Sequence, residues 1–175
     1  MNFIKKYCLN RRLSIFNRKR KEEQTNIYAL KEAKSICFFI TLNVVEKLEE
    51  LMKCISRFDN KKTIICYLPK TELPQNMAML PFLHTISNKD VNLIGGMNEQ
   101  VKNIFSQHYN IFIDIDTEQD LMSLYLKTFL SADFRIGRNK EYYNYFDFTL
   151  CADENYNIKD YISNLEKYTD KLKGN

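Results

Sequence analysis

The sequence has few of the residues on which most enzyme motifs depend. Among 175 residues there are only four glycines and two histidines. It contains no G-x-G-x-x-G, no Gly-Lys-[Ser/Thr] and no G-x-S-x-G, so it lacks the usual phosphate loops and the serine nucleophile elbow. His84 and His108 are 24 positions apart, and neither has a His or Cys at ligand spacing. We therefore predict no catalytic residue, no metal site and no cofactor.

Disulfides and membrane spans are also not expected. The five cysteines form an odd set without a C-x-x-C pair, which is typical of reduced thiols in a cytosolic protein. The longest apolar run, around Ile36–Ile40, is far shorter than the roughly 18 residues that a membrane span needs. The sequence thus predicts a cytoplasmic protein without a spanning segment.

Charge is distributed unevenly along the chain. Residues 1–21 hold eight of the 26 cations and none of the 22 anions, so the other residues carry 18 cations against 22 anions. A mildly acidic body with a basic N-terminal arm indicates an anionic neighbour for the arm. The predicted anionic-surface-binding residues are Lys5, Lys6, Arg11, Arg12, Arg18, Lys19, Arg20 and Lys21.

Several partners fit such an arm. RNA or a ribonucleoprotein would be bound through phosphates, and an acidic membrane surface through its headgroups, which would make the protein peripheral to a membrane. The apolar residues of the arm are spread over two sides of a helix and do not decide between the two. A solvated leader and an organellar transit peptide are the remaining alternatives. The body is expected to meet a protein partner.

Residues 111–139 predict a complete βαβ unit. Ile111–Ile115 is an apolar run typical of a buried parallel strand, residues 121–130 have helical spacing, and Phe134–Gly137 resumes as a strand. Before this unit we expect strands at 35–43, 62–68 and 82–86, and helices at 44–55 and 97–108. After it we expect a strand at 146–151 and a helix at 158–172.

This order predicts an α/β fold, a Rossmann-like three-layer α/β/α sandwich with a mainly parallel sheet. The link between the last two strands is too short for a crossover helix, so we expect an antiparallel hairpin at the sheet edge. Residues 1–34 are expected to form a basic helical arm and linker, and residues 35–175 a single α/β domain.

Two groups of side chains are candidates for a site in the body. Asp114, Asp116, Glu118 and Asp120 crowd the end of a central strand, where open α/β sheets bind ligands. Asp114 and Asp116 are the ligand-site candidates, although strand-end positions and capping of the next helix by Thr117 or Asp120 explain the same residues. The second group is a basic and aromatic patch that could stack bases or simply pack as a hairpin: Arg135, Arg138, Tyr142 and Tyr143.

Two resemblances bear on these motifs. Tyr109–Asp114 and Ala132–Gly137 resemble a pattern in the N-terminal half of heptosyltransferase-like GT-B glycosyltransferases. Their nucleotide-sugar half has no counterpart in 175 residues, so this resemblance implies a fold more than a reaction. The whole chain, including its start KKY-LNRRL, is similar to a small bacterial family of about this length with no known activity.

The sequence favours a non-catalytic binding or adaptor protein that contacts an anionic surface through its basic arm. The alternative is a small or degenerate enzyme, glycosyltransferase-like or binding a phosphate ligand, with its site at the Asp114–Asp120 strand end. An enzyme is the less favoured of the two.

Overall fold

The computed structural model describes residues 3–20, 26–42, 46–70, 73, 80–92, 96–116, 120–138, 145–150 and 157–173. Six strands are present, β1 (Ser35–Thr41), β2 (Lys61–Leu68), β3 (Leu83–Ser87), β4 (His108–Asp114), β5 (Ser131–Gly137) and β6 (Phe148–Thr149). The helices are α1 (Phe3–Arg20), α2 (Glu46–Ile55), α4 (Glu99–Phe105), α5 (Leu121–Lys127) and α6 (Ile158–Lys173), with a short 3-10 turn η1 (Asn88–Asp90). The expected α/β fold is confirmed.

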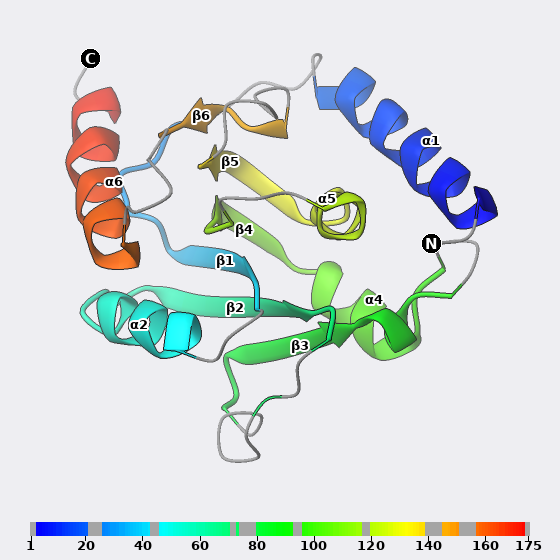
Figure 1. Cartoon of the computed structure of the whole chain (residues 1–175). Helices are drawn as coiled ribbons and strands as arrows, with labels where there is room; N and C mark the ends of the chain where they lie inside the picture. Colours follow the sequence, from blue (N-terminus) through cyan, green and yellow to red (C-terminus); the bar gives the residue numbers. More distant parts are fainter. Residues whose placement is uncertain are drawn as a thin grey trace.

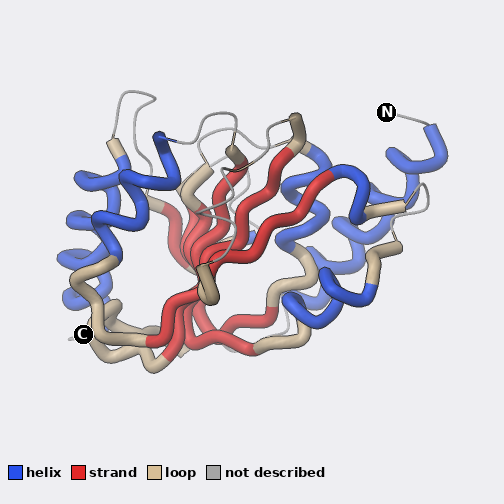
Figure 2. Tube along the Cα trace, turned by 90° about the horizontal axis from the view of Figure 1, so that it is seen from below, coloured by secondary structure: helices blue, strands red, loops and turns tan. Residues whose placement is uncertain are grey.

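The strands form one sheet in the order β3-β2-β1-β4-β5-β6, and every neighbouring pair is parallel. Helices α2 and α6 cover one face of this sheet, and α1, α4 and α5 cover the other (Figures 1 and 2). The chain therefore forms the three-layer Rossmann-like sandwich that the alternation of strands and helices predicts.

The predicted antiparallel hairpin at the sheet edge is wrong. Asp147 binds the backbone of Arg135 twice, because its N–H donates to Arg135 O over 2.8 Å and its Oδ2 accepts from Arg135 N over 2.7 Å. Phe148 consequently enters the sheet level with Ile136 and runs in the same direction as β5. The expected strand at 146–151 is only two residues long, and Cys151 lies outside the described residues.

Gly137, the last residue of β5, makes room for the segment that leads into β6. A Cβ atom at Gly137 would lie within 2.4 Å of three ring atoms of Phe146, so the ring occupies the space of a side chain. Only glycine lets the segment before β6 pack this closely on β5. This contact explains why a glycine stands at the end of β5.

Alternating strand residues supply the two halves of the core. In β1, Ile36, Phe38 and Ile40 face α2 and α6, whereas Cys37 and Phe39 face the other layer. The central strands are thus apolar on both sides, as parallel strands buried between two helical layers must be. Cys37 and Cys66 are buried free thiols within this core.

Helix α1 packs on the body through one narrow stripe. Leu9 is 0% exposed and Leu13 is 7% exposed, and both belong to the apolar cluster that includes α4 and α5. Phe16, one turn further on, stacks on Tyr145 with ring centroids 5.6 Å apart. The expected helical arm is therefore present, and its apolar side is part of the core.

The expected linker also contributes to packing. Leu30 and Ala33 are buried with α2 and α6, and Leu30 N donates to Thr169 Oγ1 over 3.3 Å. The boundary at residue 34 between the arm with its linker and the α/β domain stays a prediction. Because Leu9, Leu13 and Leu30 are buried, we expect the domain to be less stable without residues 1–34.

Candidate functional site

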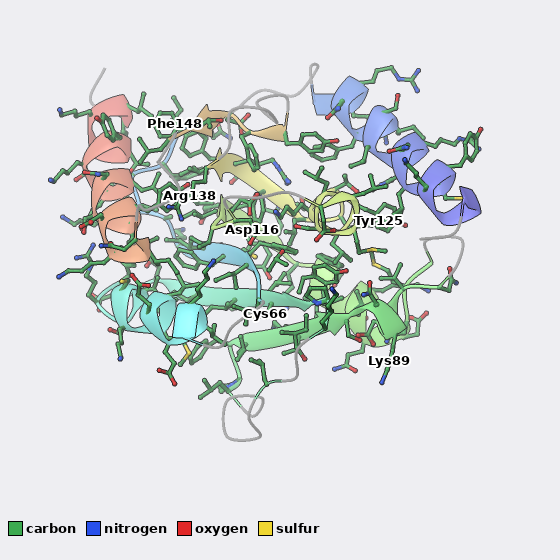
Figure 3. All side chains as sticks on the ribbon, viewed as in Figure 1. Cys66, Lys89, Asp116, Tyr125, Arg138 and Phe148 are labelled. Carbon is green, nitrogen blue, oxygen red and sulfur yellow. The ribbon has the colours of Figure 1, made fainter. Side chains whose placement is uncertain are left out.

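Asp114 and Asp116 lie where the strand order reverses. The chain builds the sheet from β1 towards β3 in one direction and from β4 towards β6 in the other, so the reversal falls between β1 and β4. Open α/β sheets bind ligands outside the carboxyl ends of the strands at this point. Figure 3 shows Asp116 at this end of the central strands. The two acids predicted from the sequence therefore lie at the position in the sheet where folds of this kind bind ligands.

A lysine of α5 occupies the space between the two carboxylates. Lys127 Nζ donates to Asp114 Oδ2 and to Asp116 Oδ2, each over 2.8 Å, and it also lies 4.8 Å from the ring centroid of Phe39. The side chain of Lys127 is 1% exposed, and those of Asp114 and Asp116 are 0% and 5% exposed. The site is an ion pair sealed from solvent.

The carboxylates decide the charge of Lys127. Desolvation by burial favours loss of its proton, but attraction and hydrogen bonding to Asp114 and Asp116 outweigh that effect and raise the pKa of Lys127. Lys127 is consequently a bound cation at neutral pH and not a nucleophilic amine.

Asp116 joins the ends of the two central strands. Its Oδ1 accepts from Thr41 N over 2.6 Å, and its Oδ2 accepts from Thr41 Oγ1 over 2.7 Å and from Ser123 Oγ over 3.1 Å. Together with Lys127, these donors come from β1 and α5. A ligand or metal ion at this strand end would have to displace contacts that already hold the fold together.

Asp120 is a helix cap, as one interpretation of the sequence predicts. Its Oδ1 accepts from Met122 N over 2.7 Å and from Ser123 N over 2.9 Å, so it satisfies two free amides at the start of α5. Glu118 and Thr117 lie outside the described residues. The predicted acidic quartet therefore contains a cap and two ion-paired carboxylates.

The cations of α1 divide into two groups. Lys6, Arg11, Arg18 and Lys19 are exposed. Arg12 instead turns to the body, where Nε and Nη2 donate to Thr128 Oγ1 and O over 3.3 and 3.4 Å. The side chains of Lys5 and Arg20, and the whole of Lys21, lie outside what the structure describes.

The two arginines of the possible basic and aromatic patch, Arg135 and Arg138, are buried. Arg135 is 1% exposed, and it donates to Tyr145 O, Leu130 O and Lys127 O over 3.1, 2.8 and 2.9 Å. Lys127 O is the last carbonyl of α5 and Leu130 O lies three residues beyond it, so Arg135 binds the chain where that helix ends. Arg138 is buried with its guanidinium 5.2 Å from the ring centroid of Tyr161. Tyr142 and Tyr143 lie outside the described residues.

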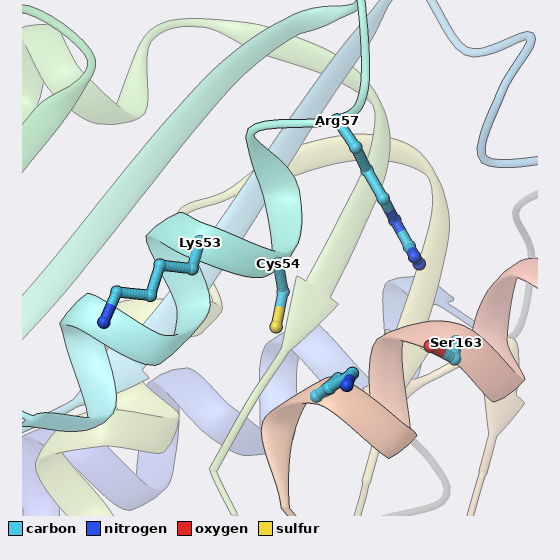
Figure 4. Close-up of a pocket in the computed structure, with 5 residues that line it drawn as sticks. Lys53, Cys54, Arg57 and Ser163 are labelled. Atoms are coloured by element: carbon cyan, nitrogen blue, oxygen red, sulfur yellow. The ribbon is translucent and has the colours of Figure 1, made fainter.

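A small hollow lies between α2 and α6, on the face of the sheet opposite to α1, α4 and α5 (Figure 4). It has a volume of about 220 Å³ and is lined by Lys53, Cys54, Arg57, Lys159 and Ser163. Arg57 is engaged by Glu166 at 2.9 Å. Desolvation and Glu50 raise the pKa of the Cys54 thiol, which keeps it protonated at neutral pH. This hollow has the character of a gap between two packed helices.

Sequence reasoning missed the partners of the strand-end acids. Thr41, Ser123 and Lys127 approach Asp116 only because β1 and α5 meet in the fold. One signal was present: Lys127 is the one charged residue among residues 121–130, most of which are apolar. A cation in such a segment must be exposed at one edge or paired inside.

Neither His108 nor His84 belongs to a cluster of potential metal ligands among the described residues. His108 is bound by Ser131 Oγ and Asp133 Oδ1 at 2.8 and 2.9 Å. In the described part of the chain, no three His, Cys, Asp or Glu side chains gather as a metal site would require. Among the helices of the described residues, none combines the length and apolar character needed to cross a bilayer.

The strand order and the layers define a Rossmann-like α/β protein with a basic N-terminal helix. Within that class, the chain belongs to a family of unknown function (DUF6913), whose model matches residues 5–172. This confirms the whole-chain resemblance to a family without a known activity. No curated protein and no solved structure matches the chain. The likeness to heptosyltransferase-like enzymes stays a prediction based on two short motifs.

Proposed function

We propose that the protein is a non-catalytic RNA-binding protein, which contacts phosphates through the outward side of α1. The observation that carries the proposal is the division of this helix into two sides. Leu9 and Leu13 are buried in the body, whereas Arg11 and Arg18 are exposed. These two arginines are seven residues apart and hence lie two turns apart along one side of the helix.

The exposed side of α1 favours a polyanion. Tyr7, Arg11 and Arg18 follow one another at helical spacing over roughly 16 Å, and residues 3–20 contain no acidic residue. Every cation on this side can therefore approach phosphates without repulsion from a carboxylate of the same helix. Release of counterions from RNA then supplies the driving force for binding.

RNA is favoured over lipid because the apolar side of α1 is used inside the protein. A helix that lies in a membrane interface inserts an exposed apolar side between the headgroups. Among the side chains of α1 that the structure describes, Tyr7 is the one large hydrophobic that is exposed, at 61%. A tyrosine beside an arginine is instead suited to stacking on a base next to a bound phosphate.

An enzymatic role at the Asp114–Asp120 strand end is the second candidate. The strand order favours it, because the acids lie where Rossmann-like proteins hold their ligands. We place it second because Lys127, Thr41 and Ser123 already engage the carboxylate of Asp116. The site is thus satisfied by the protein itself.

Fluorescence anisotropy with a labelled single-stranded 12-mer RNA tests the RNA-binding proposal. The double variant Arg11→Glu/Arg18→Glu should weaken binding strongly. The matched control Lys53→Glu/Lys159→Glu makes the same charge change on the opposite face and should bind more tightly than the α1 variant. In the parent, log affinity should fall by about 0.7 per phosphate neutralised for each unit of log salt.

Two outcomes would contradict the proposal. One is an equal loss of RNA affinity in the two double variants, since the loss would then depend on the net charge of the protein and not on α1. The other is tight binding to vesicles of phosphatidylserine and phosphatidylcholine without binding to RNA. That result would assign α1 to a membrane surface.

A further inference from the structure

A hollow opens between α4 and α5, on the same face of the sheet as α1. Its volume is about 520 Å³, and it is lined by Gly96, Met97, Lys102, Phe105, Ser106, Tyr125 and Phe129. This volume lies within the roughly 300–1,000 Å³ of typical small-molecule sites. Figure 3 places Tyr125 on α5 next to α1.

Aromatic rings form the wall of the hollow. The ring of Phe129 meets Tyr125 edge to face with centroids 5.0 Å apart, and it lies 6.0 Å from that of Phe105. Phe129 is half-buried, whereas Phe105 and Tyr125 are buried. Phe129 is therefore the most accessible of the three rings.

Cations stand at two sides of this aromatic wall. Arg12 of α1 holds its guanidinium 4.4 Å from the centroid of Phe129. Lys102 is exposed on α4 and pairs with Glu99 at 2.5 Å. Phe129 is thus shared between the hollow and the basic helix, so the hollow continues the surface that we assign to phosphates.

We propose that this hollow receives one unstacked nucleobase of a single-stranded RNA whose phosphates lie along α1. Aromatic side chains stack on bases irrespective of their sequence, while arginine and lysine neutralise the adjoining phosphates. The inference rests on the proposed function, and it adds that the RNA is single-stranded at this point. In a duplex the bases are stacked inside and cannot enter a side pocket.

Tryptophan fluorescence gives a direct test, because the chain has no tryptophan of its own. In the variant Phe129→Trp, a stacked base should quench the emission of the new indole. The probes are a single-stranded 12-mer RNA and an abasic 12-mer with the same number of phosphates. We expect quenching by the RNA and little change with the abasic strand. The control Phe148→Trp, on β6 next to α6, should respond to neither strand.

Affinity provides a second measure. Phe129→Leu keeps an apolar side chain but removes the stacking ring, so its affinity for the RNA should fall on the order of 5- to 100-fold. Its affinity for the abasic strand should stay close to that of the parent. Photocrosslinking of 4-thiouridine RNA to the parent protein needs no substitution, and the crosslinked peptides should come from residues 96–106 or 121–130.

The outcomes separate the two proposals. If the parent binds RNA through Arg11 and Arg18 but the emission of Trp at position 129 is unchanged, or falls equally with the abasic strand, the nucleobase hollow is wrong and the role of α1 stands. Crosslinks confined to α1 would lead to the same conclusion. If the parent does not bind RNA, both proposals are wrong.

Discussion

Lys127 of α5 and Asp114 of β4 form a buried ion pair with a 2.8 Å distance between Nζ and Oδ2. This contact joins a helix to the strand end where Rossmann-like proteins hold ligands. The same ammonium also contacts Asp116. A single side chain thus fixes the position of both strand-end carboxylates and of the helix that α1 packs against.

Replacing Lys127 by methionine should destabilise the fold strongly. The change leaves two carboxylates buried without their cation, a loss of about 3–5 kcal/mol in the free energy of unfolding. For a chain of this size, the melting temperature should fall by roughly 6–20 °C. Lys102→Met, at an exposed lysine of α4, is the control and should stay within about 0.5 kcal/mol of the parent. Equal melting temperatures for the two variants would contradict the role given to Lys127.

Magnesium or a nucleotide should not raise the melting temperature of the parent. A ligand that binds only the folded state stabilises it, but Lys127 engages Oδ2 of Asp114 and Oδ2 of Asp116, while Asp116 N and Thr41 N donate to the two Oδ1 atoms. Thermal shift with Mg²⁺, with ATP and with both is the measurement. A rise in the parent that disappears in Asp116→Asn would instead favour the enzymatic candidate.

Helix α1 should contribute to stability through its buried leucines. Leu9→Ala removes a fully buried side chain and should cost about 2–5 kcal/mol in the free energy of unfolding. Arg11→Ala lies on the exposed side of the same helix and should change stability by less than about 0.5 kcal/mol. Denaturant unfolding of both variants measures the difference. If Leu9→Ala matched the parent, the arm would be separable from the body, as a boundary at residue 34 predicts.

The burial of two tyrosines should cost the protein stability in alkali above about pH 10. Burial raises the pKa of Tyr67 and Tyr109 from 10.0 to about 12, so the folded state keeps protons that the unfolded state releases. The stabilisation is complete below pH 10.0 and is lost as pH rises towards about 12. The raised pKa of Lys127 acts in the same direction.

Melting temperatures between pH 8 and 12, with tyrosinate absorbance recorded in parallel, would show this effect. Tyr109→Phe removes the contribution of Tyr109 and should flatten the decline. A melting temperature that stayed constant across this range would contradict the burial of the two hydroxyl groups.

Much of the fold followed from periodicity alone. The amphipathic pattern of α2 and the apolar runs of β1 and β4 predicted their type and place, because each depends on local spacing. The direction of β6 did not follow, since it depends on Asp147 binding the backbone of Arg135. A short link was expected to give an antiparallel pair, but the pairing of Ile136 with Phe148 is parallel.

The candidate site was predictable in place but not in chemistry. Asp114 and Asp116 were found because strand ends are recognisable in the sequence. Their partners were not, since Thr41 lies 75 positions before Asp116 and only the tertiary fold brings the two together. In the same way, the sequence allowed Arg135 either to stack bases or to pack within the body, and only the fold brings its guanidinium to Leu130 O and Lys127 O.

The docking of α1 on α5 has a consequence for the order of folding. Arg12 binds Thr128, which follows it by 116 positions, so α1 cannot complete its docking until the chain as far as Thr128 has been made. Contacts between such distant residues form late and slow the folding of a domain. During translation the basic helix is therefore undocked while the strands that it will cover are still being made. Until it docks, α1 therefore exposes Leu9 and Leu13 together with its cations, so the undocked helix offers an apolar side as well as a basic one.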